Sequence, residues 1–147
     1  MQYRFCLLLC CCLILGCGSP KPYDVRAVVT LNGEPLVGAE VTLISLQRDA
    51  RAKSAFGTTD EEGQVTFKTG DIDGVFSGSY IAVVSQRVEE RTLTNNEIRA
   101  FAEVGIRYRP SVIELIPERY TRSETSNLRV RVGYWRSKDL MFNLQSE

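Results

Sequence analysis

The sequence predicts an all-β fold: an antiparallel Greek-key β-sandwich of about seven short strands, with one short helix inserted between two of them. Runs rich in β-forming residues recur at intervals of about ten residues, separated by Gly, Pro, Asn and Asp, which are typical of turns. Several runs alternate apolar and polar residues, as strands with one buried face do. Helical spacing occurs in one segment, whereas a parallel α/β sheet needs a helix after each strand, so an antiparallel sandwich is favoured.

The first two expected strands cover residues 24–31 and 40–46. The first is closed by Asn32 and Gly33, a dipeptide that favours a tight strand reversal because both residues tolerate positive φ. Pro35 and Gly38 are expected to continue this turn region. Gly38 also stands where a small residue would let two backbones cross closely.

The next two expected strands, 54–59 and 64–69, flank three consecutive acids in the stretch GTTDEEGQVTF. We expect Asp60 to accept hydrogen bonds from the backbone amides ahead of it, and Gly63 to supply a permissive backbone. Val65 and Phe67 share one face of the strand that follows. The stretch therefore predicts the corner of a hairpin.

The remaining expected strands cover residues 80–85, 126–133 and 138–145. A glycine-rich loop over 70–78 precedes the first of them, and Gly78 leads into it. This strand is apolar on both faces and is expected to be central in its sheet. The last two alternate apolar and polar residues and are expected to be joined by a turn at 134–137.

Residues 94–105 predict the inserted helix. Thr94 and Glu97 have the spacing of a capping box, in which each side chain bonds the backbone amide of the other residue. An apolar stripe at helical spacing follows the box. Its members are Ile98, Phe101, Ala102 and Gly105.

Residues 1–16 have the parts of a bacterial export signal: a basic residue, an apolar run too short to span a bilayer, and the small residue Gly16. The segment LILGC, ending at Cys17, resembles the lipobox of bacterial lipoproteins and implies that Cys17 is acylated as the mature N-terminus. A secreted protein cut elsewhere is the alternative. We therefore expect a signal peptide over 1–16, a lipidated tether over 17–23 and one β-sandwich domain over 24–147.

All five cysteines lie in the first 17 residues, so a mature chain beginning at Cys17 would keep one acylated thiol and no disulfide framework. Acyl chains on Cys17 would hold the protein at a membrane without any basic patch. We expect a location at the cell membrane or outer membrane, facing the periplasm or the exterior.

The balance of charges disfavours one class of partner, and the lack of histidine excludes several classes of active site. The chain has 18 basic and 18 acidic residues, a balance that does not favour nucleic acid as a partner. It has no histidine, which excludes Ser-His-Asp hydrolysis, histidine zinc sites and histidine general bases. No cofactor and no enzyme activity is expected.

The acidic residues suggest a catalytic or metal site only weakly. Adjacent acids at a turn tip project apart into water, whereas acid/base catalysis needs two carboxyls that converge on one substrate. The stretch that starts at Asp71 and Asp73 begins like a calcium loop but has Phe76 and Ala82 where an EF-hand needs glycine and glutamate. An irregular calcium site of Asp60, Asp71 and Asp73 is the alternative to ordinary turn use.

A second candidate surface lies in the sequence RVRVGYWR. Arg129 and Arg131 share the outer face of a strand, and Trp135, the single tryptophan, follows them at a turn. Arg and Trp are enriched at binding hot spots, and aromatic rings stack on sugars and cations. The alternative is a solvated strand face with Trp135 covering the end of the core.

Several stretches together resemble one family. NGEPLVGAEVTL, GTTDEEGQVTF, DGVFSGSY, LIPERYTRSETSNLRVRV and a closing FNL look like the small lipoproteins abundant in planctomycete bacteria, whose mature part is similar to the carboxypeptidase regulatory-like, or transthyretin-like, Ig-like β-sandwich. The matched positions are Gly33, Pro35, Gly38, Ala39, Thr59, Asp60, Gly63, Gly78, Tyr80, Pro117, Tyr120, Thr125, Ser126 and Leu128. None of them is known as catalytic in the family, and the histidines of the transthyretin-like hydrolases of purine breakdown are absent here.

The leading hypothesis is a non-enzymatic, lipid-anchored cell-envelope lipoprotein whose β-sandwich is a structural or binding module for a protein or a glycan. A small-ligand or calcium-binding envelope protein that uses the acidic loops is the alternative, and an enzyme ranks last.

Overall fold

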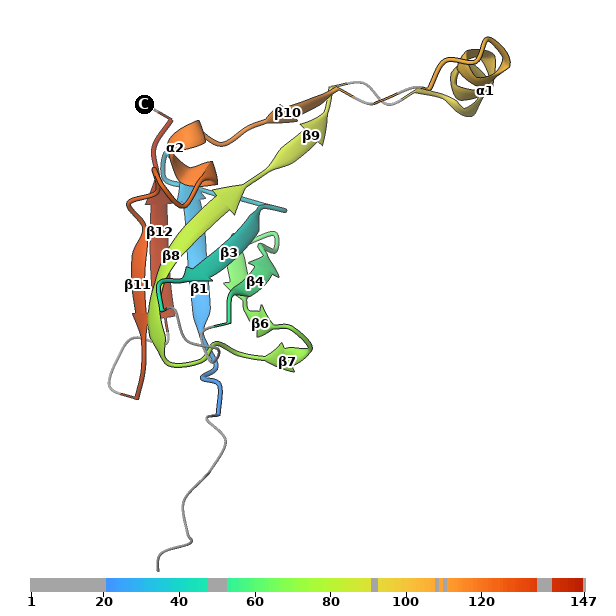
Figure 1. The fold of residues 1–147 in the computed structure, drawn as a ribbon. Coiled ribbons are helices and arrows are strands. Elements are labelled where there is room, and N and C mark those ends of the chain that lie inside the picture. The colour runs from blue at the N-terminus through green and yellow to red at the C-terminus, as the bar shows by residue number, and fades with distance from the viewer. Residues whose placement is uncertain are drawn as a thin grey trace, which may run out of the picture.

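A computed structural model describes residues 21–47, 53–90, 93–107, 109, 111–134 and 139–146. These residues form an all-β sandwich with a short inserted helix, as the sequence predicts (Figure 1). Cys17, the proposed lipidation site, and Trp135, part of the predicted binding surface, lie outside the described residues.

Two sheets make the two layers of the sandwich. The first contains β1 (Arg26–Leu31), β2 (Glu34–Pro35), β5 (Gln64–Thr66) and β12 (Asp139–Leu144). The second has the order β11-β8-β3-β4-β6-β7, with β3 (Glu40–Ser45), β4 (Ala55–Thr58), β6 (Lys68–Thr69), β7 (Ile72–Asp73), β8 (Gly78–Ser85) and β11 (Arg129–Val132). As expected, β8 is central in its sheet, between β11 and β3. A four-residue helix, α2 (Glu118–Thr121), was not predicted; it precedes β11.

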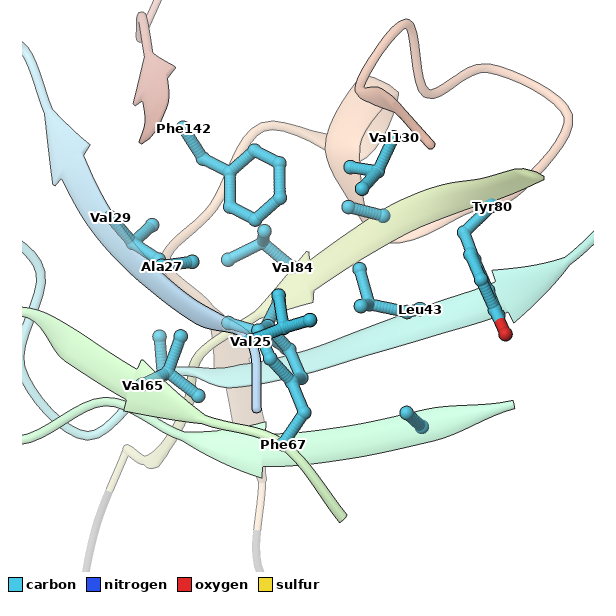
Figure 2. Close-up of a cluster of buried hydrophobic side chains, with 14 of the residues drawn as sticks. Val25, Ala27, Val29, Leu43, Val65, Phe67, Tyr80, Val84, Val130 and Phe142 are labelled. Atoms are coloured by element: carbon cyan, nitrogen blue, oxygen red, sulfur yellow. The ribbon is translucent and has the colours of Figure 1, made fainter. Parts of the chain in front are cut away.

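The core lies between the two sheets and consists of alternate residues of each strand. β1 contributes Ala27 and Val29, β3 contributes Leu43, and β8 contributes Tyr80 and Val84, each at most 1% exposed. Figure 2 shows these side chains from both layers meeting in one cluster. Burial of these apolar side chains between the two sheets is the main stabilising contribution to the sandwich.

One strand pair departs from the antiparallel expectation. β12 runs parallel to β1, from Arg26 opposite Asp139 to Leu31 opposite Leu144. The reason is that β11 pairs with β8 in one sheet while β12 pairs with β1 in the other. β11 and β12 therefore belong to different sheets and do not pair with each other. Most of the turn expected at 134–137 lies outside the described residues.

The acidic corner forms the predicted turn, but the strands on its two sides belong to different sheets: β4 pairs with β3 and β6, and β5 pairs with β1. Asp60 Oδ1 accepts hydrogen bonds from Glu62 N (3.1 Å) and Gln64 N (2.7 Å). Gly63 has φ of +72°, and a Cβ there would lie 2.6 Å from Val29 O. The corner is therefore a connection between layers and not a hairpin of one sheet.

Other predicted turns are confirmed or corrected in detail. Asn32 and Gly33 have φ of 53° and 89° and link β1 to β2, although Pro35 lies inside β2 and not in the turn. Gly38 has φ of +71° with open space where a Cβ would lie, so backbone conformation and not a close crossing explains the glycine. The expected loop at 70–78 contains β7, which pairs with β6, and Gly78 begins β8 as expected.

A separate arm continues from the end of β8. It consists of a two-stranded ribbon, β9 (Arg87–Glu89) and β10 (Val112–Glu114), with α1 (Asn95–Glu103) at its tip. Figure 1 shows the ribbon carrying α1 away from the sandwich. Neither of the helices that the structure describes has the length and apolar content needed to cross a bilayer.

Candidate functional site: a helix-tipped arm

The root of the arm is fixed by one carboxylate. Glu114 accepts hydrogen bonds from the backbone amides of Gln86 (2.6 Å) and Ile116 (3.3 Å), and its other oxygen lies 3.4 Å from Arg87 Nε. Leu115 N also donates to Gln86 O at 2.9 Å. The two chains of the ribbon are therefore held together where they leave the sandwich.

The ribbon itself is short and only partly covered. Val88 pairs with Ile113, and Glu90 N donates to Ser111 O beyond them. Val88 is 39% exposed, Ile113 43% and Val112 51%. A two-stranded ribbon alone is marginally stable in water, so these apolar side chains make a surface suited to a further contact.

The capping box predicted at the start of α1 is confirmed. Thr94 Oγ1 accepts from Glu97 N at 3.5 Å, and Glu97 Oε2 accepts from Thr94 N at 2.9 Å. Two backbone amides that a helix N-terminus leaves unpaired are thereby satisfied within the arm.

The end of α1 is closed by backbone bonds of the Schellman type. Gly105 has φ of +73°, its N donates to Ala102 O (3.1 Å), and Ile106 N donates to Phe101 O (2.9 Å). This pairing is the 5→2 and 6→1 pattern that terminates many helices. Local hydrogen bonds therefore define both ends of α1.

The helix so defined buries none of its nine residues. Ile98 of the helix is 45% exposed, and Val104 and Ile106, which follow the helix, are 69% and 54% exposed. Leu93, just before the helix, is buried at 9% exposure, although it is not part of the sandwich core. The predicted apolar stripe thus faces solvent rather than the sandwich.

Two shallow hollows lie on the helix. The first, about 530 Å³, is lined by Ile98, Ala102, Gly105, Ile106 and Arg107. The second, about 340 Å³, is lined by Leu93, Glu97, Ala100, Phe101, Val104 and Ile106. Ile106 lines both, so apolar surface continues from one side of the helix tip to the other.

Charged side chains surround this apolar surface. Arg99, Arg107 and Arg109 make no ion pair with any residue that the structure describes, and neither does Glu103. The described residues from 93 to 111 include three arginines and two glutamates. One of the glutamates, Glu97, is engaged in the capping box. The tip is therefore apolar with a net positive rim.

Comparisons with protein-family models, with curated proteins and with solved structures found no match. The geometry of the chain itself therefore carries the functional argument.

The predicted arginine surface lies elsewhere, on the outer face of the sandwich. Arg129 and Arg131 lie opposite Ile81 and Ser79 of β8 and, with Leu46, border a shallow hollow of about 300 Å³. The structure thus places both arginines at one hollow but does not describe Trp135. Neither arginine forms an ion pair with a described residue.

The acids of the weak calcium alternative are not gathered into one site. Asp60 bonds its own turn, whereas Asp73 lies in β7 and pairs with Lys68 Nζ at 3.3 Å. The described residues contain no group of three or more His, Cys, Asp or Glu side chains that could hold a metal ion.

Three groups with shifted pKa values lie in the sandwich or its loops, away from the arm. Burial raises the pKa of Tyr80, whose hydroxyl donates to Phe76 O at 2.7 Å. A hydrogen bond from Arg119 lowers the pKa of Tyr120, and the backbone amide and Ser123 lower that of Glu124. These shifts follow from local packing and hydrogen bonds.

The sequence indicated the helix but not the arm. The available signal for the arm was weak: Val88 stands between two charged residues, and Val112 and Ile113 are the two apolar residues of the strand that pairs with it. Three-residue runs are too short to be recognised as strands without that pairing.

Proposed function

We propose that the protein is a non-enzymatic, lipid-anchored cell-envelope lipoprotein whose β-sandwich presents a binding arm to another envelope component, a protein or a glycan. The observation that carries the proposal is α1: it is capped at both ends, projects from the fold and buries none of its nine residues. A helix of this length is marginal in isolation, and burial of its apolar face against another molecule would stabilise it.

The anchor fits the geometry of the sandwich. The described chain begins beside the loop that enters β8, where Tyr23 N and Val75 O are 2.8 Å apart. β8 then runs to the opposite end of the sandwich, where the arm begins (Figure 1). With lipid on Cys17, a few residues before Tyr23, this arrangement directs the arm away from the membrane.

Several observations support a binding module over an enzyme. The sequence has no histidine, and the hollows described above are shallow. Two of them combine apolar side chains with arginines, and the third combines apolar side chains with Glu97. The resemblance to planctomycete lipoproteins with a transthyretin-like domain points in the same direction, because none of the matched residues is known as catalytic in that family.

The anchor is tested by Cys17→Ser. We expect the wild-type protein to fractionate with membranes and to incorporate labelled fatty acid, and Cys17→Ser to lose both properties. A variant that stays membrane-bound without label would show that the anchor proposal is wrong.

Binding by the arm is tested by shortening it. Residues 88–113 are replaced by Asn-Gly, the dipeptide that already links Leu31 to Glu34 in this chain, so that Arg87 and Glu114 remain a directly opposed pair. We expect an unchanged unfolding temperature and the loss of crosslinks to envelope components in intact cells. Unchanged crosslinks in the folded, shortened protein would overturn the proposed function.

A further inference from the structure

The shape of the apolar surface on the arm tip favours a concave partner. Ile98 lines one hollow of the helix, Val104 lines the other, and Ile106 lines both. A flat surface can contact one side of a nine-residue helix, whereas a groove contacts two sides at once. Exposed apolar side chains on both sides are therefore best matched by a groove.

The charges around this surface favour carboxylates on the partner. Arg107 borders the larger hollow, Arg109 lies two residues further along the chain, and Arg99 is exposed on the helix. None of the three is paired with a described carboxylate. An interface rim of opposite charge would pair them and would raise the association rate.

A second copy of the chain is a poorer match, because the carboxylates at its described hollows are already engaged. Glu97 on the arm belongs to the capping box, and Asp60 at the acidic corner accepts from the amides of its own turn. The hollow on the outer face of the sandwich carries Arg129 and Arg131, which would oppose the arginines of the arm. The hollow of about 620 Å³ at the arm root contains carboxylates, but two of its ion pairs already use them: Arg87 with Glu114 and Arg122 with Glu118.

A bilayer is also less well matched than a protein. The described chain begins at the end of the sandwich opposite the arm, so a lipid on Cys17 would place the tip far from the anchoring membrane (Figure 1). Glu97 and Glu103 lie on the same short helix and oppose insertion into an anionic surface.

We infer that the arm docks α1 into an apolar groove of a different envelope protein, and that Asp and Glu side chains on the rim of that groove pair with Arg107 and Arg109. This inference rests on the proposed function and names the class of its partner. Ile98, Val104 and Ile106 fill the groove, and the capped ends of the helix present them already ordered, which lowers the entropic cost of binding.

The probe is a benzophenone amino acid placed at position 104 of the full, lipid-anchored chain and irradiated in intact cells of its native host. The matched control carries the same probe at position 141, because Met141 is 70% exposed and Val104 is 69% exposed. We expect a discrete adduct with one other protein from position 104 and not from 141. Mapped by mass spectrometry, the crosslinked peptide should have apolar residues flanked by Asp or Glu.

Charge reversal tests the rim. Arg107→Glu with Arg109→Glu should lower the adduct yield about tenfold, since close opposite charges become like charges across the interface. Lys21→Glu with Lys53→Glu, at two exposed lysines outside the arm, changes the net charge equally and should leave the yield unchanged. Equal yields in the two double variants would overturn the acidic rim.

Two other kinds of adduct from position 104 would overturn the inference that α1 docks into a groove of a different protein. An adduct of twice the protein's own mass would indicate a second copy. A lipid-sized adduct, with flotation of the Cys17→Ser protein on phosphatidylglycerol vesicles, would indicate a bilayer. Either result would leave the lipid anchor and the binding role of the arm standing, because these fail only if the anchor or the arm-shortening test fails; a bilayer would replace the protein or glycan as the bound component. No adduct in folded protein would also overturn the inference.

Discussion

The sandwich and the arm are held together by different kinds of interaction. The sandwich buries a continuous core in which Val29, Leu43 and Leu144 have no exposed surface. In the arm, Leu93 alone among the apolar residues described between 87 and 115 is buried, and local hydrogen bonds close both ends of the helix. Stability of the sandwich should therefore depend on packing across the whole fold, and order in the arm on its own caps.

Removing one buried leucine should give the largest difference between the two regions. Leu43→Ala deletes a fully buried side chain of β3 and should lower the free energy of unfolding by about 2–5 kcal/mol. Leu115→Ala, at a leucine 47% exposed on the arm, should change it by less than about 0.5 kcal/mol. Urea unfolding of both variants measures this. Similar losses would mean that the arm folds together with the core.

Substitutions at two glycines with nearly equal φ distinguish the cost of backbone strain from the cost of a crowded Cβ. Gly38 and Gly63 have φ of +71° and +72°, but a Cβ has open space at Gly38 and would meet Val29 O at 2.6 Å at Gly63. Gly38→Ala should cost about 1 kcal/mol from the backbone alone. Gly63→Ala should cost at least about twice that, and Gly63→Val more. Equal costs in urea unfolding would show that the inter-sheet corner relaxes freely.

The sequence predicted what local chemistry determines. The turns at Gly33 and Gly63 and the cap at Thr94 depend on residues within a few positions of one another, and the structure confirms them. The sheet to which a strand belongs depends on partners far along the chain. Phe67 lies where the chain leaves the sheet of β5 and enters the sheet of β6, and the alternation of apolar and polar residues does not indicate this change. For the same reason the parallel pairing of β12 with β1 was missed.

The candidate site shows the same limit. The apolar stripe of α1 has the spacing of a helix that packs on a core, and sequence period does not reveal whether a core is there. The projection depends on the pairing of Val88 with Ile113 across the inserted helix. The arginine surface, by contrast, was predictable in part, because strand alternation alone places Arg129 and Arg131 on one face.

Two threonines compare a buried hydrogen bond of the sandwich with a cap of the arm. Thr59 is 4% exposed and its Oγ1 accepts from Ala39 N at 2.8 Å, so Thr59→Ala should lower global stability by about 1–2 kcal/mol. Thr94→Ala should destabilise α1 by about 1 kcal/mol and leave the global unfolding temperature unchanged. Amide hydrogen exchange distinguishes the two variants, because Thr94→Ala should give faster exchange only in the arm. Faster exchange throughout the sandwich would show that the arm is coupled to it.

The smallest difference is expected between Glu97, a half-buried glutamate of the arm, and Glu61, an exposed glutamate of the acidic corner. Glu97→Gln keeps an acceptor in the capping box, because Gln can replace Glu there, but it removes a negative charge from the helix N-terminus. The free energy of local opening of α1, measured by hydrogen exchange, should therefore fall by about a few tenths of a kcal/mol. Glu61→Gln, at the acidic corner, removes a charge from an exposed turn whose backbone amides Asp60 already satisfies. It should change neither the unfolding temperature nor local exchange. A clear loss of stability in Glu61→Gln that added calcium enhances would instead indicate an ion held at the corner, and the calcium alternative would regain support over the binding arm.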